Sequence, residues 1–265
     1  MTETSKALVT RGNSGFAIVD DSAAADIMIS AFDQLGLSNF QLDRIKIPSG
    51  GMTSWEVESL EGTSVEKHVD AIIVSMVGKQ KSWWAVPMDE GGAGSPPSCS
   101  SKDGRTGLGN NTLDASAPDG KHACQTCTWN QFGSSRGKGE GKDCSDTTLL
   151  FFFPKGGRIP SLLVVPATSL KSLQGYVLRL INAGKRMETC VTRLALKKTT
   201  SRSGISYSTL DISWAGDLGE EEAAGMVEIA KEFRAKSQEF SVHQDGGAVG
   251  DPTSGDPTIV GDVPF

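Results

Sequence analysis

The run His68-Val-Asp-Ala-Ile-Ile-Val-Ser-Met-Val77 contains one of the two longest apolar stretches of this 265-residue chain. Its near-continuous apolar character is typical of a strand that is buried on both faces. Gly78 follows it, and Lys79–Val86 is again rich in strand-forming residues. We therefore expect a tight hairpin at Gly78, joining two strands of one sheet.

Shorter segments with strand character lie on both sides of this run. They are Phe40–Ile47, Ser54–Leu60, Thr148–Phe153, Ser161–Val165, Glu188–Lys197 and Ser206–Trp214. Apolar residues at helical spacing predict helices over residues 21–35, over Ser169–Ala183 with Gly184 just past its end, and over Leu218–Lys236. Many short strands with few helices favour a mainly β (α+β) fold around a small β-barrel.

Residues 87–148 interrupt this pattern. They are rich in Gly, Ser, Asp and Asn, lack apolar periodicity, and contain four of the five cysteines. A stretch longer than any ordinary loop needs something to organise it. Cys124-Gln-Thr-Cys127 presents two thiolates from one turn, and Cys99 and Cys144 flank it. Four such ligands suit a tetrahedral structural zinc, which stabilises small domains by about 10–16 kcal/mol.

Other states of these cysteines are conceivable: free thiols, disulfides, or a redox pair. A redox pair normally lies at a helix start in a βαβ unit, which this segment lacks, and disulfides do not suit a reducing compartment. His122 lies two residues before Cys124 and could replace Cys99 as a ligand, although we favour Cys99. Cys190 falls within a strand pattern and is expected to be a small buried apolar residue.

The net charge of −6 conceals a strong asymmetry. Residues 121–198 hold 13 Lys and Arg against 4 Asp and Glu, a local charge of +9, whereas residues 237–265 hold five acids and no Lys or Arg. Cations that follow phosphates and flat rings that stack on unpaired bases are what sequence-tolerant single-strand binding requires. Basic and aromatic side chains intermingle at these candidate DNA contacts: Lys79, Lys81, Trp83, Trp84, Trp129, Phe132, Arg136, Lys138, Lys142 and Arg193. Neighbouring residues of a strand face opposite sides, so one of Trp83 and Trp84 is expected in the core.

The chain ends in a Gly-, Asp- and Pro-rich segment, residues 241–265, that we expect to be disordered. Its last residues are Asp262, Val263, Pro264 and Phe265. A terminal aromatic ring can fill an apolar pocket of a partner protein, while basic residues of that partner pair with the neighbouring carboxylates. This end resembles the acidic tip of bacterial single-stranded DNA-binding proteins, which finishes in Asp-Asp-Ile-Pro-Phe. The resemblance implies recruitment of replication or recombination proteins through the tip.

Residues 40–215 resemble a family of phage-type single-stranded DNA-binding proteins. The resemblance is carried by the following segments: Ile47-Pro-Ser-Gly-Gly51, Cys99-Ser-Ser-Lys-Asp103-Gly104, Cys124-Gln-Thr-Cys127, Asn130-Gln-Phe-Gly133-Ser134, Gly139-Glu-Gly141-Lys142-Asp-Cys144, Leu149–Phe153 and Pro166-Ala-Thr-Ser169. It implies an OB-type barrel over residues 1–240 with a zinc-binding insertion at 87–148, and no catalytic activity.

No enzyme site is evident in the sequence, because there is no phosphate-binding GxxxxGK[ST] loop and no histidine pairs with an obvious nucleophile. We expect a non-enzymatic protein that binds and protects single-stranded DNA during replication or recombination. The alternatives are a zinc-ribbon accessory factor in transcription or DNA processing, an adaptor that works through its tail, and a divergent nuclease. A homo-oligomer is compatible with the sequence. The polar Met1–Thr10 segment lacks a signal-like apolar region, so we expect a cytoplasmic protein, in the bacterial host if phage-encoded.

Overall fold

The structure is a computed structural model, and it describes residues 15–16, 42–59, 61–86, 97–109, 120–136, 141–201 and 204–237. The helix predicted over residues 21–35, the candidate contact Lys138 and the tail at 241–265 lie outside the described residues. No helix in the described part combines the length and the apolar character needed to cross a bilayer.

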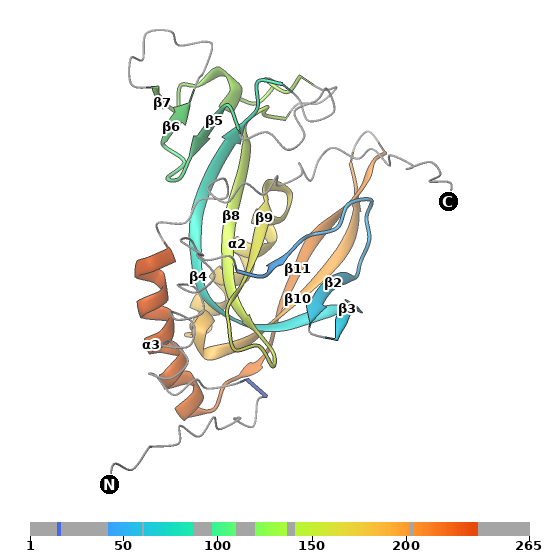
Figure 1. Cartoon of the computed structure of the whole chain (residues 1–265), viewed down its shortest axis with the longest axis vertical. Coiled ribbons are helices and arrows are strands. Elements are labelled where there is room, and N and C mark those ends of the chain that lie inside the picture. The colour runs from blue at the N-terminus through green and yellow to red at the C-terminus, as the bar shows by residue number, and fades with distance from the viewer. Residues whose placement is uncertain are drawn as a thin grey trace.

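Strands dominate the described residues, which confirms the prediction of a mainly β fold (Figure 1). The strands are β1 (Arg44–Ile45), β2 (Trp55–Ser59), β3 (Gly62–Glu66), β4 (His68–Trp83), β5 (Cys99–Ser101), β6 (Thr106–Gly109), β7 (Lys121–Ala123), β8 (Ser145–Pro154), β9 (Ser161–Pro166), β10 (Cys190–Thr200) and β11 (Ser206–Asp217). The helices are α2 (Ala167–Asn182) and α3 (Glu220–Ser237), with short 3₁₀ turns η2 (Thr128–Asn130) and η3 (Met187–Thr189).

The long strand β4 corrects the prediction of a hairpin at Gly78. β4 continues through Gly78, and β8 runs antiparallel beside it on both sides of this glycine. Val77 is paired with Leu149 and Gln80 with Thr147, so three steps along β4 match two steps along β8. This mismatch is a β-bulge, which absorbs one residue without reversing the chain. The bulge therefore replaces the expected turn.

The main sheet does not close into a barrel. Its strand order is β1-β9-β8-β4-β5-β6-β7, and β10 pairs with both β4 and β11. In the described part of the chain β1 pairs only with β9, and β11 pairs only with β10, so both strands are edges of the sheet. The expected closed barrel is therefore wrong for the described part of the chain. Helix α2 packs against β8 and β9 on one side and against β11 on the other.

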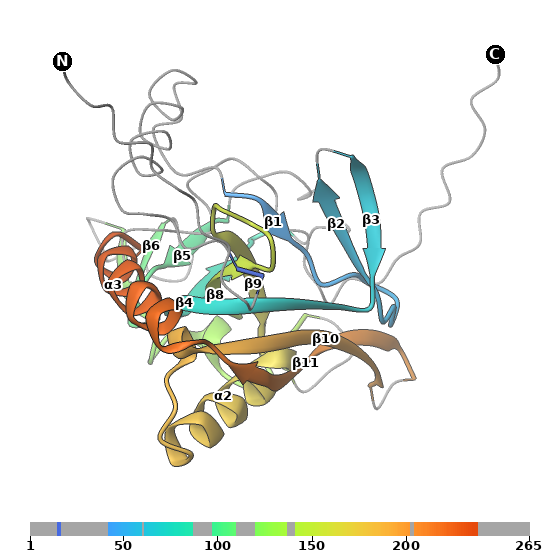
Figure 2. The same ribbon diagram turned by 90° about the horizontal axis from the view of Figure 1, so that it is seen from below.

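Two apolar cores lie on opposite faces of β4 and β8. Ala71 and Ile73 belong to the core that α2 and β10 cover, whereas Ile72 and Val74 belong to the core that α3 covers. Figure 2 shows α2 and α3 on different sides of the strands. Alternation along a strand explains how one apolar run supplies both cores. The sequence prediction of a strand buried on both faces is confirmed.

The predicted helix over Ser169–Ala183 is confirmed as α2. Its end is a Schellman motif, in which Gly184 N–H donates to the carbonyl of Ile181 (3.0 Å) and Lys185 N–H donates to that of Leu180 (2.9 Å). Gly184 has a φ of +68°, a left-handed conformation that favours glycine. The glycine therefore ends the helix where the sequence places it.

A buried carboxylate fixes α3 to the sheet. Glu188 is 2% exposed; its Oε1 accepts hydrogen bonds from Arg186, and Arg234 forms an ion pair with Oε2 (2.8 Å). Arg234 Nε also donates to the carbonyl of Val74 in β4 (3.2 Å). Burial raises the pKa of Glu188, but a backbone hydrogen bond and the two arginines outweigh it and leave the pKa lowered.

Replacing the carboxylate of Glu188 tests whether its ion pairs with Arg186 and Arg234 stabilise the fold. We expect Glu188→Gln to lower the free energy of unfolding at pH 7 by about 2 kcal/mol, because the two arginines lose a buried charged acceptor. Since the folded pKa is below the ordinary value of 4.5, the carboxylate stabilises the fold fully above pH 4.5. That contribution is lost as the pH falls through the folded pKa, so the difference between wild type and variant shrinks there.

Urea denaturation at several pH values measures this difference. The exposed Glu56, which lies on β2, supplies the control Glu56→Gln. A loss of stability in Glu188→Gln that stays constant down to pH 3 would contradict an ionic role.

Candidate functional site

The cysteine-rich insertion is attached to the last residues of β4 and the first residues of β8, which pair with each other. β5 pairs with the last residues of β4, with Lys81 opposite Ser101 and Trp83 opposite Cys99. β6 and β7 extend this sheet by one strand each, at one end of the molecule (Figure 1). Two strands that contribute to both apolar cores therefore support a segment that has little apolar core of its own.

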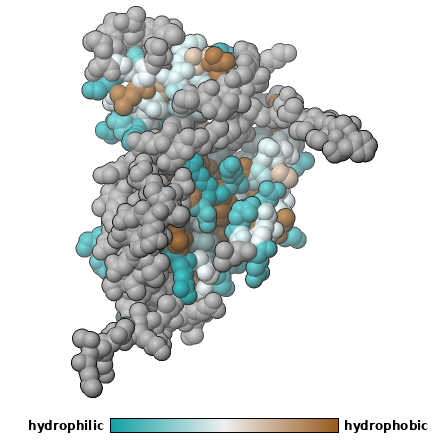
Figure 3. Space-filling view, in the orientation of Figure 1, coloured by the Kyte–Doolittle hydropathy of each residue, from teal (hydrophilic) through white to brown (hydrophobic). Residues whose placement is uncertain are grey.

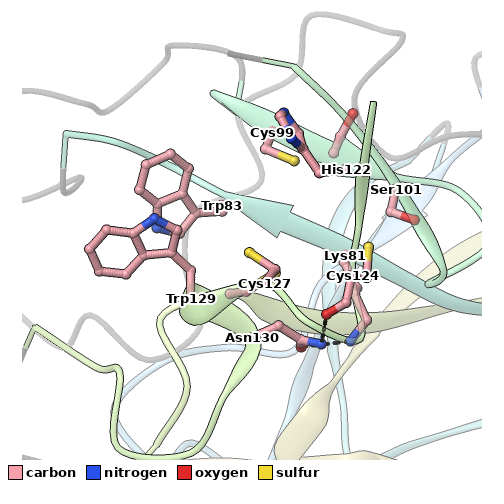
Figure 4. A pocket seen from close by; sticks show the side chains of 12 residues that line it. Lys81, Trp83, Cys99, Ser101, His122, Cys124, Cys127, Trp129 and Asn130 are labelled. Atoms are coloured by element: carbon pink, nitrogen blue, oxygen red, sulfur yellow. Dashed lines mark hydrogen bonds between the residues drawn. The ribbon is translucent and has the colours of Figure 1, made fainter. Parts of the chain in front are cut away.

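The structure brings the four predicted cysteines around one small cavity of about 20 Å³, which is room for a single ion or water-sized body (Figure 4). Cys99 comes from β5, Cys124 follows β7, Cys127 precedes η2, and Cys144 precedes β8. None of these four cysteines forms a disulfide in this structure. As the side chains stand, no three His, Cys, Asp or Glu residues of the described part are arranged so that they could hold a metal ion together.

Because Gly107 has no side chain, the thiols of Cys99 and Cys124 can both lie close to its backbone. A Cβ atom at this glycine would lie 2.8 Å from Cys99 Sγ and 3.7 Å from Cys124 Sγ. A contact under 3.0 Å is too close, so any side chain here would displace Cys99. His122 is paired with Gly107 across β6 and β7, and its Nε2 hydrogen-bonds to the carbonyl of Gly109 (2.9 Å). Both Cys99 and His122 thus line the cavity.

Burial controls the chemistry of the thiols. Burial, together with smaller effects of the neighbouring thiols, raises the pKa of Cys99 to about 11 and that of Cys144 to about 12. Burial also raises the pKa of Cys124, against opposing effects of Ser101 and Lys81. These thiols are therefore protonated at neutral pH in the absence of a cation, and a bound divalent cation would favour the thiolates.

A buried polar network lies beside the cavity. Lys81 Nζ donates to Asp146 Oδ1 (2.5 Å) and Asn130 Oδ1 (2.9 Å). Lys142 Nζ donates to Asp146 Oδ2 (2.6 Å) and to the same oxygen of Asn130 (3.1 Å). Asn130 Nδ2 in turn donates to the carbonyl of Cys124 (2.6 Å). Burial raises the pKa of Asp146, but the two lysines outweigh it and the pKa is lowered.

Two tryptophans and an arginine join the insertion to β4. The rings of Trp83 and Trp129 stack with their centroids 5.1 Å apart, and Arg136 lies 5.8 and 5.7 Å from these centroids. Arg136 also donates to the carbonyls of Trp84 and Ala85. Trp83 Nε1 donates to Asp143 Oδ2 (2.6 Å), which also pairs with Arg136 (2.8 Å). These contacts hold residues 128–136 against the end of β4.

Thiols are the donor type that a soft divalent cation such as zinc prefers, although the described side chains do not stand in a metal-binding arrangement. Four thiols line a cavity of ionic size, and Gly107 leaves space for two of them. The buried Nε1 of Trp129, another residue that lines the cavity, has no hydrogen-bond partner. An N–H donor and an ammonium group beside the thiols are the surroundings that a negatively charged metal–thiolate cluster needs.

The structure separates the predicted DNA contacts into buried and exposed residues. Lys81 is 7% exposed and Trp83 is 3% exposed, so neither predicted DNA contact presents its side chain at the surface of this structure. Each instead supports the insertion from within. Phe132 is 83% exposed, and Lys79 and Arg136 are also exposed.

The remaining candidates have different surroundings. Trp84 is half-buried, and Lys142 is partly buried beside Asp146. Arg193 lies on β10 rather than in the insertion, and it forms a bidentate pair with Asp70 (2.7 and 2.9 Å). Sequence reasoning missed Gly107, Asn130, Asp143 and Asp146. Their roles depend on the contacts of Lys81, Trp83 and Cys99, which are distant in the sequence, so the sequence alone did not single them out.

No protein-family model, curated protein or solved structure matches this chain.

Proposed function

We propose that this chain is a non-enzymatic protein that binds and protects single-stranded DNA, with little sequence preference, during replication or recombination. The observation that carries the proposal is Phe132, an 83% exposed ring on the surface of the cysteine-rich insertion. Apolar side chains reach the surface of this insertion in Figure 3. An exposed aromatic ring is costly to leave in water and is the group on which an unpaired base stacks.

The surroundings of Phe132 support this role. The ammonium of Lys142 lies 5.8 Å from the centre of the ring, and Arg136 is exposed nearby in the sequence. The stacked pair of Trp83 and Trp129 holds the same segment in place. Asp143 and Asp146 offset part of the local positive charge. Stacking at Phe132, rather than charge alone, is therefore proposed to supply much of the affinity.

A binding series with labelled oligonucleotides tests this function. We expect tighter binding to an unstructured single strand than to its duplex, and a fall in affinity with salt of about 0.7 log units per neutralised phosphate for each log unit of salt. Phe132→Ala should weaken single-strand binding by about 5- to 150-fold, because one stacked base contributes about 1–3 kcal/mol.

The matched control is Leu178→Ala, which removes a 67% exposed side chain from α2 and should leave binding unchanged. Equal affinity of the wild type for duplex and single strand would instead favour an accessory factor in transcription or DNA processing. Unchanged binding by Phe132→Ala would remove the assigned contact.

We also propose that Cys99, Cys124, Cys127 and Cys144 hold one structural zinc ion, with His122 outside the ligand set. Zinc bound by these thiols would link β5, the turn after β7, and the start of β8. Gly107→Ala should lower the zinc content and the melting temperature, because its Cβ would collide with Cys99 Sγ. Gly141→Ala is the matched control, since a Cβ there meets nothing within 4 Å.

Metal analysis of the purified proteins measures the outcome. One zinc per wild-type chain and per Gly141→Ala chain is expected. A wild-type protein without zinc whose insertion remains protected from hydrogen exchange would contradict the proposal.

The third part of the proposal concerns residues 241–265, which lie outside the described residues. We propose that this acidic tail competes with DNA, and that Asp262, Val263, Pro264 and Phe265 recruit partner proteins. Deleting residues 241–265 should tighten single-strand binding at low salt and change it little at high salt, because salt screens the attraction. Deleting Phe265 alone should leave DNA binding unchanged. Fluorescence anisotropy at two salt concentrations measures both, and weaker binding after the long deletion would refute tail competition.

A further inference from the structure

Lys81 is a buried cation for which DNA binding provides no explanation. It is 7% exposed, lies in β4, and lines the cavity of the four cysteines (Figure 4). A buried ammonium is costly unless an anion or strong acceptors surround it. Its Nζ contacts Asp146 and Asn130, and Asp146 is already paired with Lys142.

The charges of this network do not balance. Lys81 and Lys142 bring two positive charges, and the carboxylate of Asp146 brings one negative charge. The side chains of these three residues are between 9% and 17% exposed, so solvent offsets the excess only in part. Within this network of described residues, one positive charge therefore has no carboxylate partner of its own, and it lies beside a cavity that four thiols line.

We propose that Lys81 is the positioning residue that supplies the countercharge for a zinc–thiolate cluster in this cavity. Four thiolates and one divalent cation carry a net charge of −2. The ammonium of Lys81 then attracts an anion that exists only when metal is bound, which favours the loaded state. The inference rests on the proposed zinc site and deepens it.

A second contact connects Lys81 with the ligands. Asn130 accepts a hydrogen bond from Lys81 and donates to the carbonyl of Cys124. Asn130 N–H also donates to the carbonyl of Cys127 (3.1 Å). The side chain of Asn130 thus orients Lys81 and holds the carbonyl of Cys124, while its backbone N–H closes the turn at Cys127. Outer-sphere partners of this kind typically change metal affinity by about 10- to 100-fold when they are removed.

Lys142 offers a matched control, because it makes the same pair of contacts without lining the cavity. Its Nζ bonds Asp146 and the same Asn130 oxygen, so Lys142→Met breaks equivalent interactions. Among the described residues that line the cavity, Lys81 is the cationic side chain. Lys81→Met removes that charge, whereas Lys81→Arg retains it.

The experiment measures zinc affinity of the full-length chain by competition with a chromophoric chelator. Lys81→Met should bind zinc about 10- to 100-fold more weakly than wild type. Lys142→Met should lose distinctly less affinity, and Lys81→Arg should remain closer to wild type than Lys81→Met. At saturating Co²⁺, the sulfur-to-cobalt charge-transfer absorption should have wild-type intensity in Lys81→Met, because all four thiolates still bind.

The outcomes separate the two proposals. A wild type that binds no zinc overturns the zinc site and the role of Lys81 together. A wild type that binds one zinc, with equal affinity in Lys81→Met, overturns only the role of Lys81. If Lys81→Met does not fold, Lys81→Arg is compared with wild type instead. Wild-type affinity in Lys81→Arg supports the role of the charge, and a loss of about 10-fold or more overturns it.

Discussion

The antiparallel pairing of β4 with β8 is the interaction on which the rest of the molecule depends. Alternate residues of these two strands enter both apolar cores, so α2 and α3 pack against opposite faces of the same ladder. The ladder then continues beyond the cores, where Lys81 is paired with Asp146. Disruption of this pairing would therefore remove the support of both helices and of the cysteine cavity at once.

Much of the fold could be predicted where the sequence has a clear period. The spacing of apolar residues and the glycine at position 184 located α2, and the strand patterns located β10 and β11. Other elements depend on partners that a local pattern does not contain. Gly78 continues β4 because β8 lies beside it, and β3 was missed because most of its residues are exposed. The prediction of a closed barrel was wrong for a related reason. Closure would require the edge strands β1 and β11 to find further partners, which no local sequence pattern specifies.

The candidate site shows the same division. Spacing alone identified Cys99, Cys124, Cys127 and Cys144, and the structure places them around one cavity. It could not identify the ion pair of Lys81 with Asp146, whose members are 65 residues apart. Charge and aromatic content also could not distinguish the exposed Phe132 from the buried Trp83. Burial depends on tertiary packing. Residue type therefore predicted which side chains could stack or carry charge, but not which of them are accessible at the surface.

The stacked indoles give the insertion an optical signature. Trp83 and Trp129 come from β4 and η2, and their ring planes differ by 18° at a centroid separation of 5.1 Å. Two indole transitions at this distance are coupled, so they act as an exciton pair in circular dichroism. The pair exists only while η2 remains docked on β4. Its spectrum therefore reports the integrity of the cysteine-rich segment in the unlabelled protein, separately from the backbone signal of the two cores.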